Sequence, residues 1–250
     1  MIGNRLFILL LFFTLIFPSY SDSISVYYEE GLSAYKKGQY NLSVQNFEFI
    51  LALEWESSEL YYNLGNSFFR LNDIPNAIWA YEYCLKLSPN HADARYNLQL
   101  VNLKVVDKIE LPNPPFYLEW YLSTKENFTS NEWINISLFI FLFFTLTSVL
   151  IRLKINKYIH SVRAIILVLF FISTLFTIDS ILTFTSTKSG IISKLKVEVR
   201  SEPNKYSTKL FQVHEGLKVH VKNNEIEWIE IELLDGKSGW IANSEIKLIN

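Results

Sequence analysis

The amino-acid sequence predicts a multidomain α plus β protein: a short α-solenoid of helical repeats, two transmembrane helices and a small C-terminal β-barrel. Three observations support this. A 34-residue period runs from residue 24 to about residue 106, where Gly31 and Gly65 stand in equivalent positions. Two later apolar runs are about as long as a spanning helix needs to be. After residue 190, apolar residues alternate with polar ones, as they do in β-strands.

The first apolar run, residues 6–17, predicts an export signal. A bilayer core of roughly 30 Å needs about 20 helical residues, so this run is too short to span it. Ser19 and Ser21 are the small residues that signal peptidase prefers, which favours cleavage before Asp22 and a signal peptide over residues 1–21. An uncleaved anchor is the alternative, and either would export the segment that begins at Asp22.

Residues 134–151 and 164–184 predict two transmembrane helices. The loop between them, residues 152–163, holds four basic residues and no acidic one, which indicates a cytoplasmic loop. Both flanking parts are then expected outside the cytoplasm, in agreement with the export signal. Asp179 is the one charge within these runs. We expect its carboxylate to reach the interface or to bond the other spanning helix; a role in function is the alternative.

Residues 108–133 predict a proline-containing linker that leads onto the membrane surface. Pro112, Pro114 and Pro115 remove backbone donors and fix φ, so the segment cannot be helical throughout. Amphipathic aromatic residues, which favour the headgroup layer, come after the prolines at Trp120, Tyr121 and Trp133.

Residues 22–107 predict the repeat domain. The 34-residue step recurs in the second unit most fully, at Tyr61, Tyr62, Leu64, Gly65, Phe68, Ala77, Tyr81 and Pro89. This pattern resembles the tetratricopeptide repeat. The first unit departs from it at Ser43 and Trp55, and the third stops after one helix. Because about three repeats are needed for independent stability, we expect this domain to lean on a partner or on a second copy.

The resemblance to tetratricopeptide repeats implies a peptide- or partner-binding groove, lined by the first helix of each pair. The residues that it places there are Tyr28, Tyr62, Asn66, Phe69, Arg70 and Tyr96. The alternative for such aromatic residues is a place in the core. The lysines of the carboxylate-clamp members of this family are missing, so we do not expect a C-terminal carboxylate as ligand.

Residues 191–250 predict the β-barrel, with a strong hairpin signal at Asp235-Gly236. The runs 197–203, 228–231 and 235–241 resemble a bacterial SH3-like domain. Such domains can bind peptidoglycan peptides or protein segments. The resemblance makes Arg200, Trp228 and Trp240 the candidate ligand face; the alternative places both tryptophans in the core.

The sequence does not predict an enzyme. The four histidines show no metal-ligand spacing, and there is no phosphate-binding glycine loop. A small buried packing residue is the expected role of Cys84, the single cysteine. We expect no metal and no cofactor. A net charge of −2 without a basic stripe also speaks against nucleic-acid binding.

The order of these parts along the whole chain is similar to that of the repeat-containing (BatE-like) members of the aerotolerance operon (Bat) family. The resemblance implies a bacterial inner-membrane protein with periplasmic domains. It implies an envelope complex with von Willebrand A-domain membrane proteins, linked to aerotolerance or stress resistance. We therefore expect a non-enzymatic scaffold, which could also form homo-oligomers. The alternative is a sensor or anchor that grips peptidoglycan through the barrel.

Overall fold

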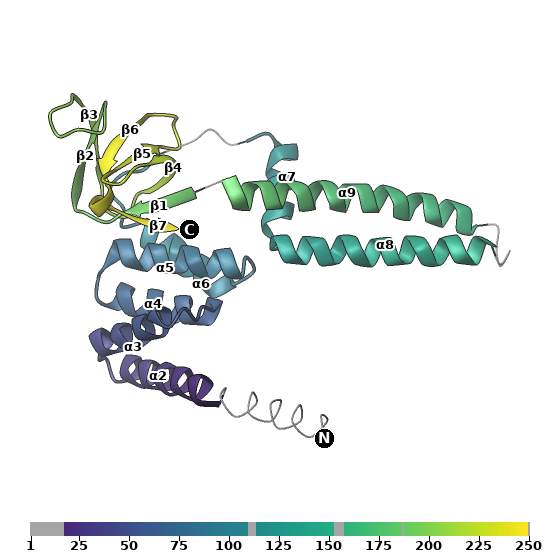
Figure 1. Ribbon diagram of the computed structural model, residues 1–250, viewed down its shortest axis with the longest axis horizontal. Helices are drawn as coiled ribbons and strands as arrows, with labels where there is room; N and C mark the ends of the chain where they lie inside the picture. Colours follow the sequence, from purple (N-terminus) through teal and green to yellow (C-terminus); the bar gives the residue numbers. More distant parts are fainter. Residues whose placement is uncertain (1–17, 110–113, 153–157, 187, 250) are drawn as a thin grey trace, which may run out of the picture.

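The computed structural model describes residues 18–109, 114–152, 158–186 and 188–249 (Figure 1). The apolar run of the expected signal peptide lies outside these residues. The described residues begin with the helical domain, which contains α2 (Pro18–Lys36), α3 (Tyr40–Ala52), α4 (Ser58–Arg70), α5 (Ile74–Leu87) and α6 (Ala92–Asn102).

Two helical hairpins, α2/α3 and α4/α5, repeat the same close crossing 34 residues apart. A Cβ atom on Gly31 would lie 2.5 Å from Cε1 of Phe47, and one on Gly65 would lie 2.7 Å from Cε1 of Tyr81. Only glycine therefore lets each ring lie directly against the partner helix. The turn after the first helix of each pair also repeats, because Gly38 and Asn72 both have a positive φ.

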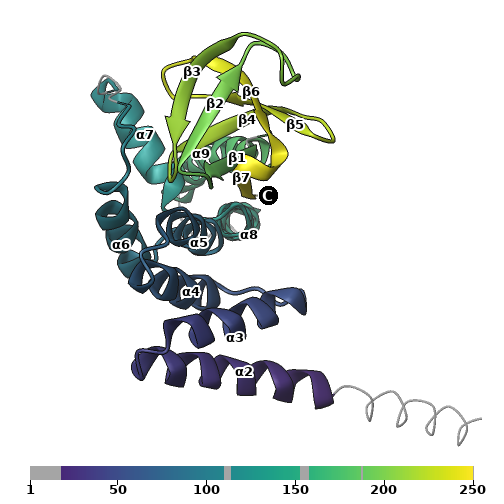
Figure 2. The same cartoon turned by 90° about the vertical axis from the view of Figure 1, so that its left-hand side faces the viewer.

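The helical core is made of the side chains between these layers, with Phe47, Ile50, Leu60, Leu64 and Tyr81 fully or almost fully buried. Figure 2 shows α2, α3, α4 and α5 as successive layers, with a β-sheet on the far side of α5. Helix α6 stands where a third pair would start, and among the described residues no second helix follows it in the helical domain.

Helices α7 (Phe116–Glu126), α8 (Ser130–Arg152) and α9 (Ile159–Ser186) come next in the chain. Both α8 and α9 are long and apolar enough to cross a membrane, and little of either is buried. They pack as an antiparallel hairpin through hydroxyl contacts: Ser130 with Ser180 at 2.9 Å, and Ser137 with Ser173 and Thr177 at 3.0 Å each.

The carboxylate of Asp179 on α9 binds residues of α7. One of the two expectations for this residue was a bond to the other spanning helix, α8; the bonds found go to α7 instead. Its Oδ2 atom accepts a hydrogen bond from the Tyr121 hydroxyl at 2.7 Å and lies 2.6 Å from Nζ of Lys125. The rings of Tyr121 and Trp133 both stack on Phe176, which fixes α7 against the end of the hairpin. The segment expected to be a linker is thus partly helical, and it supplies Tyr121 and Lys125 as the partners of the Asp179 carboxylate.

The C-terminal β-domain is one antiparallel sheet with strand order β3-β2-β6-β5-β4-β1-β7. Its elements are β1 (Lys188–Ile192), β2 (Lys196–Arg200), β3 (Lys209–His214), β4 (Lys218–Asn224), β5 (Trp228–Glu232), β6 (Ser238–Ala242), the 3₁₀ turn η1 (Asn243–Glu245) and β7 (Ile246–Ile249). The core residues alternate along the strands, with Val197, Val199, Ile229, Ile231 and Ile241 fully buried.

The β-domain packs directly on α5. Ile191 and Ile249 are buried in the same apolar cluster as the helical core. The Trp79 indole donates to the carbonyl of Leu248 at 2.8 Å, and Nζ of Lys247 lies 3.6 Å from the centre of the Trp79 ring. The helical domain is therefore packed against another part of the same chain.

Further polar contacts join the two domains. Nζ of Lys247 donates to Oδ1 of Asn76 at 2.8 Å, and Lys218 forms an ion pair with Glu82 at 2.7 Å. Both domains lie at the same end of the α8/α9 hairpin, and Arg152 and Ile159, which end α8 and begin α9, face the other end (Figure 1).

Candidate functional site

The three tyrosines of the 34-residue step come from the first helix of each pair: Tyr28 from α2, Tyr62 from α4 and Tyr96 from α6. Tyr28 and Tyr62 are half-buried, whereas Tyr96 is 61% exposed. The Tyr28 hydroxyl accepts a hydrogen bond from Nδ2 of Asn63 at 2.9 Å, and burial, with nearby Glu59, raises the pKa of Tyr28. Tyr28 and Tyr62 pack against the helical core without being fully buried, and the place of the three tyrosines in a groove stays a prediction.

Asn66, also expected in the groove, holds three helices together. Its Oδ1 atom accepts one hydrogen bond from the Tyr81 hydroxyl at 2.7 Å and another from Nδ2 of Asn97 at 2.9 Å. These bonds join α4 to α5 and α6. The carbonyl of Asn66 is therefore engaged inside the protein, and its main role is to fix the angle between the tyrosine-bearing helices.

Phe69 and Arg70 both take part in cation–ring contacts between neighbouring helical units. The Arg70 guanidinium lies 4.9 Å from the centre of the Tyr40 ring, and Nζ of Lys104 lies 4.9 Å from the centre of the Phe69 ring. Lys104 was absent from the sequence-based candidates. The signal that could have found it is the repeat step, since Lys36, Arg70 and Lys104 are each 34 positions apart.

The candidate face of the β-domain lies on the outside of its sheet. Arg200 on β2 and Glu230 on β5 flank Trp240 on β6 as cross-strand neighbours. Trp228 and Trp240 are half-buried and alternate with the core residues of their strands. The alternative that both tryptophans belong to the core is therefore wrong.

Arg200 is engaged within the β-domain itself. Its guanidinium donates to Oε2 of Glu198 and to the Ser207 carbonyl, both at 3.0 Å. These contacts hold the β2–β3 loop, in which Tyr206 is 99% exposed. Ile226, in the loop before Trp228, is 97% exposed. The exposed apolar side chains Tyr206 and Ile226 thus lie in loops, whereas Arg200 is engaged within the β-domain.

Within the described parts of the chain, no cluster of three His, Cys, Asp or Glu side chains could hold a metal ion. Cys84 is fully buried on α5, and burial raises the pKa of its thiol to about 12. A thiol with this pKa stays protonated near neutral pH, so it lacks the thiolate that nucleophilic chemistry needs. Cys84 is therefore a packing residue.

Residues 186–247 match the family described as Bacterial SH3 domain. This match covers the β-domain and agrees with the resemblance seen in the sequence. No curated protein matches the chain.

Proposed function

We propose that this protein is a non-enzymatic inner-membrane scaffold whose helical domain is a short tetratricopeptide solenoid that binds partner proteins. The repeated crossings at Gly31 and Gly65, and the equivalent left-handed turns at Gly38 and Asn72, support the solenoid. In this proposal the β-domain, docked on α5, stabilises an array of two and a half repeats.

The observation that carries the proposal is the row of accessible tyrosines on the first helices. The β-domain covers α5, the second helix of its pair, and leaves Tyr28, Tyr62 and Tyr96 accessible. Tyrosine and other large aromatic side chains are the residues that most often dominate binding at protein interfaces. A partner segment bound along this row would contact all three pairs at once.

Co-purification from detergent-solubilised membranes tests this proposal. We expect the wild-type protein to recover a small set of membrane proteins, and the Tyr28→Ala/Tyr62→Ala/Tyr96→Ala variant to lose them. Tyr206→Ala, a fully exposed tyrosine of the β-domain, is the matched control and should retain them. Partners that survive in the groove variant would refute the proposal.

We further propose a two-pass topology with both domains outside the cytoplasm, in the periplasm. The position of both domains at one end of the α8/α9 hairpin supports it, as does the basic character of residues 152–163. Single cysteines at Lys37 and Lys205, in a Cys84→Ala background, should react with an impermeant maleimide in intact spheroplasts. A cysteine at Lys154 should react only after lysis, and the reverse pattern would overturn the topology.

By its resemblance to the Bat family, the chain would act in an envelope complex with von Willebrand A-domain proteins, in aerotolerance or stress resistance. A second copy of the chain is another candidate partner. Mass spectrometry of the co-purified proteins distinguishes these outcomes.

The alternative is a cell-wall sensor or anchor. It is favoured by the outward position of Trp228 and Trp240 and by the match to a bacterial SH3 domain. If it holds, the full chain should sediment with isolated peptidoglycan sacculi, and Trp228→Ala should weaken that binding. Equal recovery with and without sacculi would exclude it.

A further inference from the structure

The helical domain carries a second row of equivalent side chains, and this row is cationic. Lys36, Arg70 and Lys104 are separated by the repeat step of 34 residues, so each repeat unit carries one of them at an equivalent position. Lys36 and Arg70 are the last residues of α2 and α4, and Lys104 stands two residues beyond the end of α6. All three are exposed. We name this row the basic lip.

The cations of the basic lip are held by aromatic rings and an amide. Arg70 lies over Tyr40 and Lys104 over Phe69, and Nζ of Lys104 donates to Oδ1 of Asn72 at 3.2 Å. Across the ranges that the structure describes, no carboxylate forms an ion pair with any of the three. The charges of Arg70 and Lys104 are therefore held in position by contacts that do not neutralise them.

The acidic residues of α4 and α6 lie at the ends opposite the basic lip, whereas α2 carries Glu29 and Glu30 within two turns of Lys36. Glu59 and Asp93 are in the first turns of α4 and α6. Each stands 11 positions before the cation of its own unit, which is about 16 Å along a helix. In these two units the acidic side chain and the cation of the basic lip therefore stand at opposite ends of the helix.

We infer that the basic lip binds an extended acidic segment of a partner protein. This inference deepens the proposed function and rests on it, because it gives the chemistry of the partner in the same groove. Helix α2 contacts α4, and Asn66 on α4 bonds Asn97 on α6, so the helices that carry the lip are neighbours, and packed helix axes are about 8–10 Å apart. A polyproline II segment advances about 9 Å in three residues, so carboxylates at every third position match the spacing of the lip.

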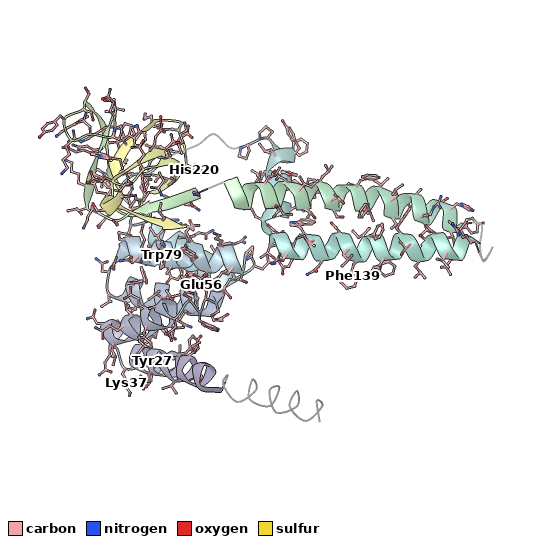
Figure 3. The ribbon with its side chains drawn as sticks, in the orientation of Figure 1. Tyr27, Lys37, Glu56, Trp79, Phe139 and His220 are labelled. Atoms are coloured by element: carbon pink, nitrogen blue, oxygen red, sulfur yellow. The ribbon has the colours of Figure 1, made fainter. Side chains whose placement is uncertain are left out.

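The position of the basic lip on the molecule favours a protein over a lipid surface as its partner. Lys37, next to Lys36 at the end of α2, lies at the edge of the helical domain remote from the α8/α9 hairpin (Figure 3). Trp79 marks the helix that the β-domain covers, and Phe139 lies on the hairpin itself (Figure 3). A membrane crossed by α8 and α9 would therefore lie on the other side of the molecule from the end of α2 that carries Lys36.

Fluorescence anisotropy with a synthetic probe tests the inference on the full chain in detergent. The probe is a labelled peptide of about 12 residues with the repeat Glu-Pro-Ser, and its Gln-Pro-Ser counterpart is the neutral control. We expect the glutamate peptide to bind at least about tenfold more tightly than the glutamine peptide. Its affinity should also fall as salt is raised from about 0.05 to 0.5 M, because exposed ion pairs are screened.

Matched charge variants locate the binding. Lys36→Gln/Arg70→Gln/Lys104→Gln should weaken binding of the glutamate peptide at least about tenfold. The control Lys194→Gln/Lys196→Gln/Lys205→Gln removes the same charge from exposed positions of the β-domain and should change nothing. Thermal unfolding of both variants checks that they remain folded, since cations in a last helical turn also complement the helix dipole.

Three results would overturn the inference. These are equal binding of the two peptides, unchanged binding in the basic-lip variant, or lip-dependent sedimentation with phosphatidylglycerol vesicles in place of peptide binding. The proposed function fails separately, when the tyrosine variant keeps its co-purified partners. If the tyrosine variant loses them and the basic-lip variant keeps both partners and peptide affinity, only the inference is wrong.

Discussion

The candidate groove residues of the helical domain and the outer face of the β-domain use similar residue types in different ways. Each has aromatic side chains beside an arginine. In the groove, Arg70 is exposed and rests on a ring. In the β-domain, the Arg200 side chain is only 17% exposed and donates to Glu198 and Ser207. The difference teaches that one arginine is available to a partner, while the other holds its own domain together.

The largest expected effect is the difference in stability between removing a buried tyrosine beneath the candidate groove and removing an exposed one on its surface. Tyr81→Ala removes a fully buried ring and its hydrogen bond to Asn66, and should lower the free energy of unfolding by about 3–5 kcal/mol. Tyr96→Ala, at a 61% exposed position, should change it by less than about 0.5 kcal/mol. Urea unfolding of the full chain in detergent, followed by circular dichroism, measures both. Equal losses would mean that Tyr96 is a packing residue.

A matched pair of arginine substitutions sharpens the comparison. Arg200→Gln should lower the free energy of unfolding of the β-domain by about 1–2 kcal/mol, because it removes the bond to the Ser207 carbonyl. Arg70→Gln should cost at most about 0.5 kcal/mol, since Arg70 has a ring contact and no ion pair among the described residues. Thermal melts of the two variants give the difference. The reverse order would remove the distinction drawn between the two surfaces.

The smallest effect concerns the contact between the domains. Burial against α5 lowers the pKa of Lys247, whereas in the unfolded chain it is near the ordinary 10.5. Between the lowered value and about 10.5 the unfolded state binds more protons, so this residue contributes stability that rises with pH. The difference in unfolding midpoint between the wild-type protein and the Lys247→Met variant should therefore rise with pH through that window. A flat difference would mean that Lys247 is solvated in solution.

Much of the fold could be predicted, because repetition and alternation are local signals. The 34-residue step located the glycines that lie under Phe47 and Tyr81, and strand alternation located the β-domain. The same alternation puts Trp228 and Trp240 in register with Glu230, on the outside of the sheet. The core alternative is wrong because Ile229, Ile231 and Ile241, on the opposite side of the same strands, already fill the core.

The contacts between distant segments could not be predicted. Trp79 meets Leu248, and Tyr121 meets Asp179, without any shared period or motif in the sequence. Such contacts depend on how whole elements pack, and one sequence does not encode their pairing in a readable pattern. Lys104 is different from these residues, because its position one repeat step after Arg70 can be seen in the sequence. Only its contact with the Phe69 ring required the structure.

Site-specific photo-crosslinking in cells tests the central claim that partners bind in the groove. The photoreactive residue p-benzoylphenylalanine would replace Tyr96 in one variant and Trp228 in another, both in the full-length chain. The account predicts discrete crosslinks to membrane proteins from position 96, lost when Tyr28 and Tyr62 are also changed to alanine. Crosslinks from position 228 alone, or to peptidoglycan, would contradict it and assign recognition to the β-domain.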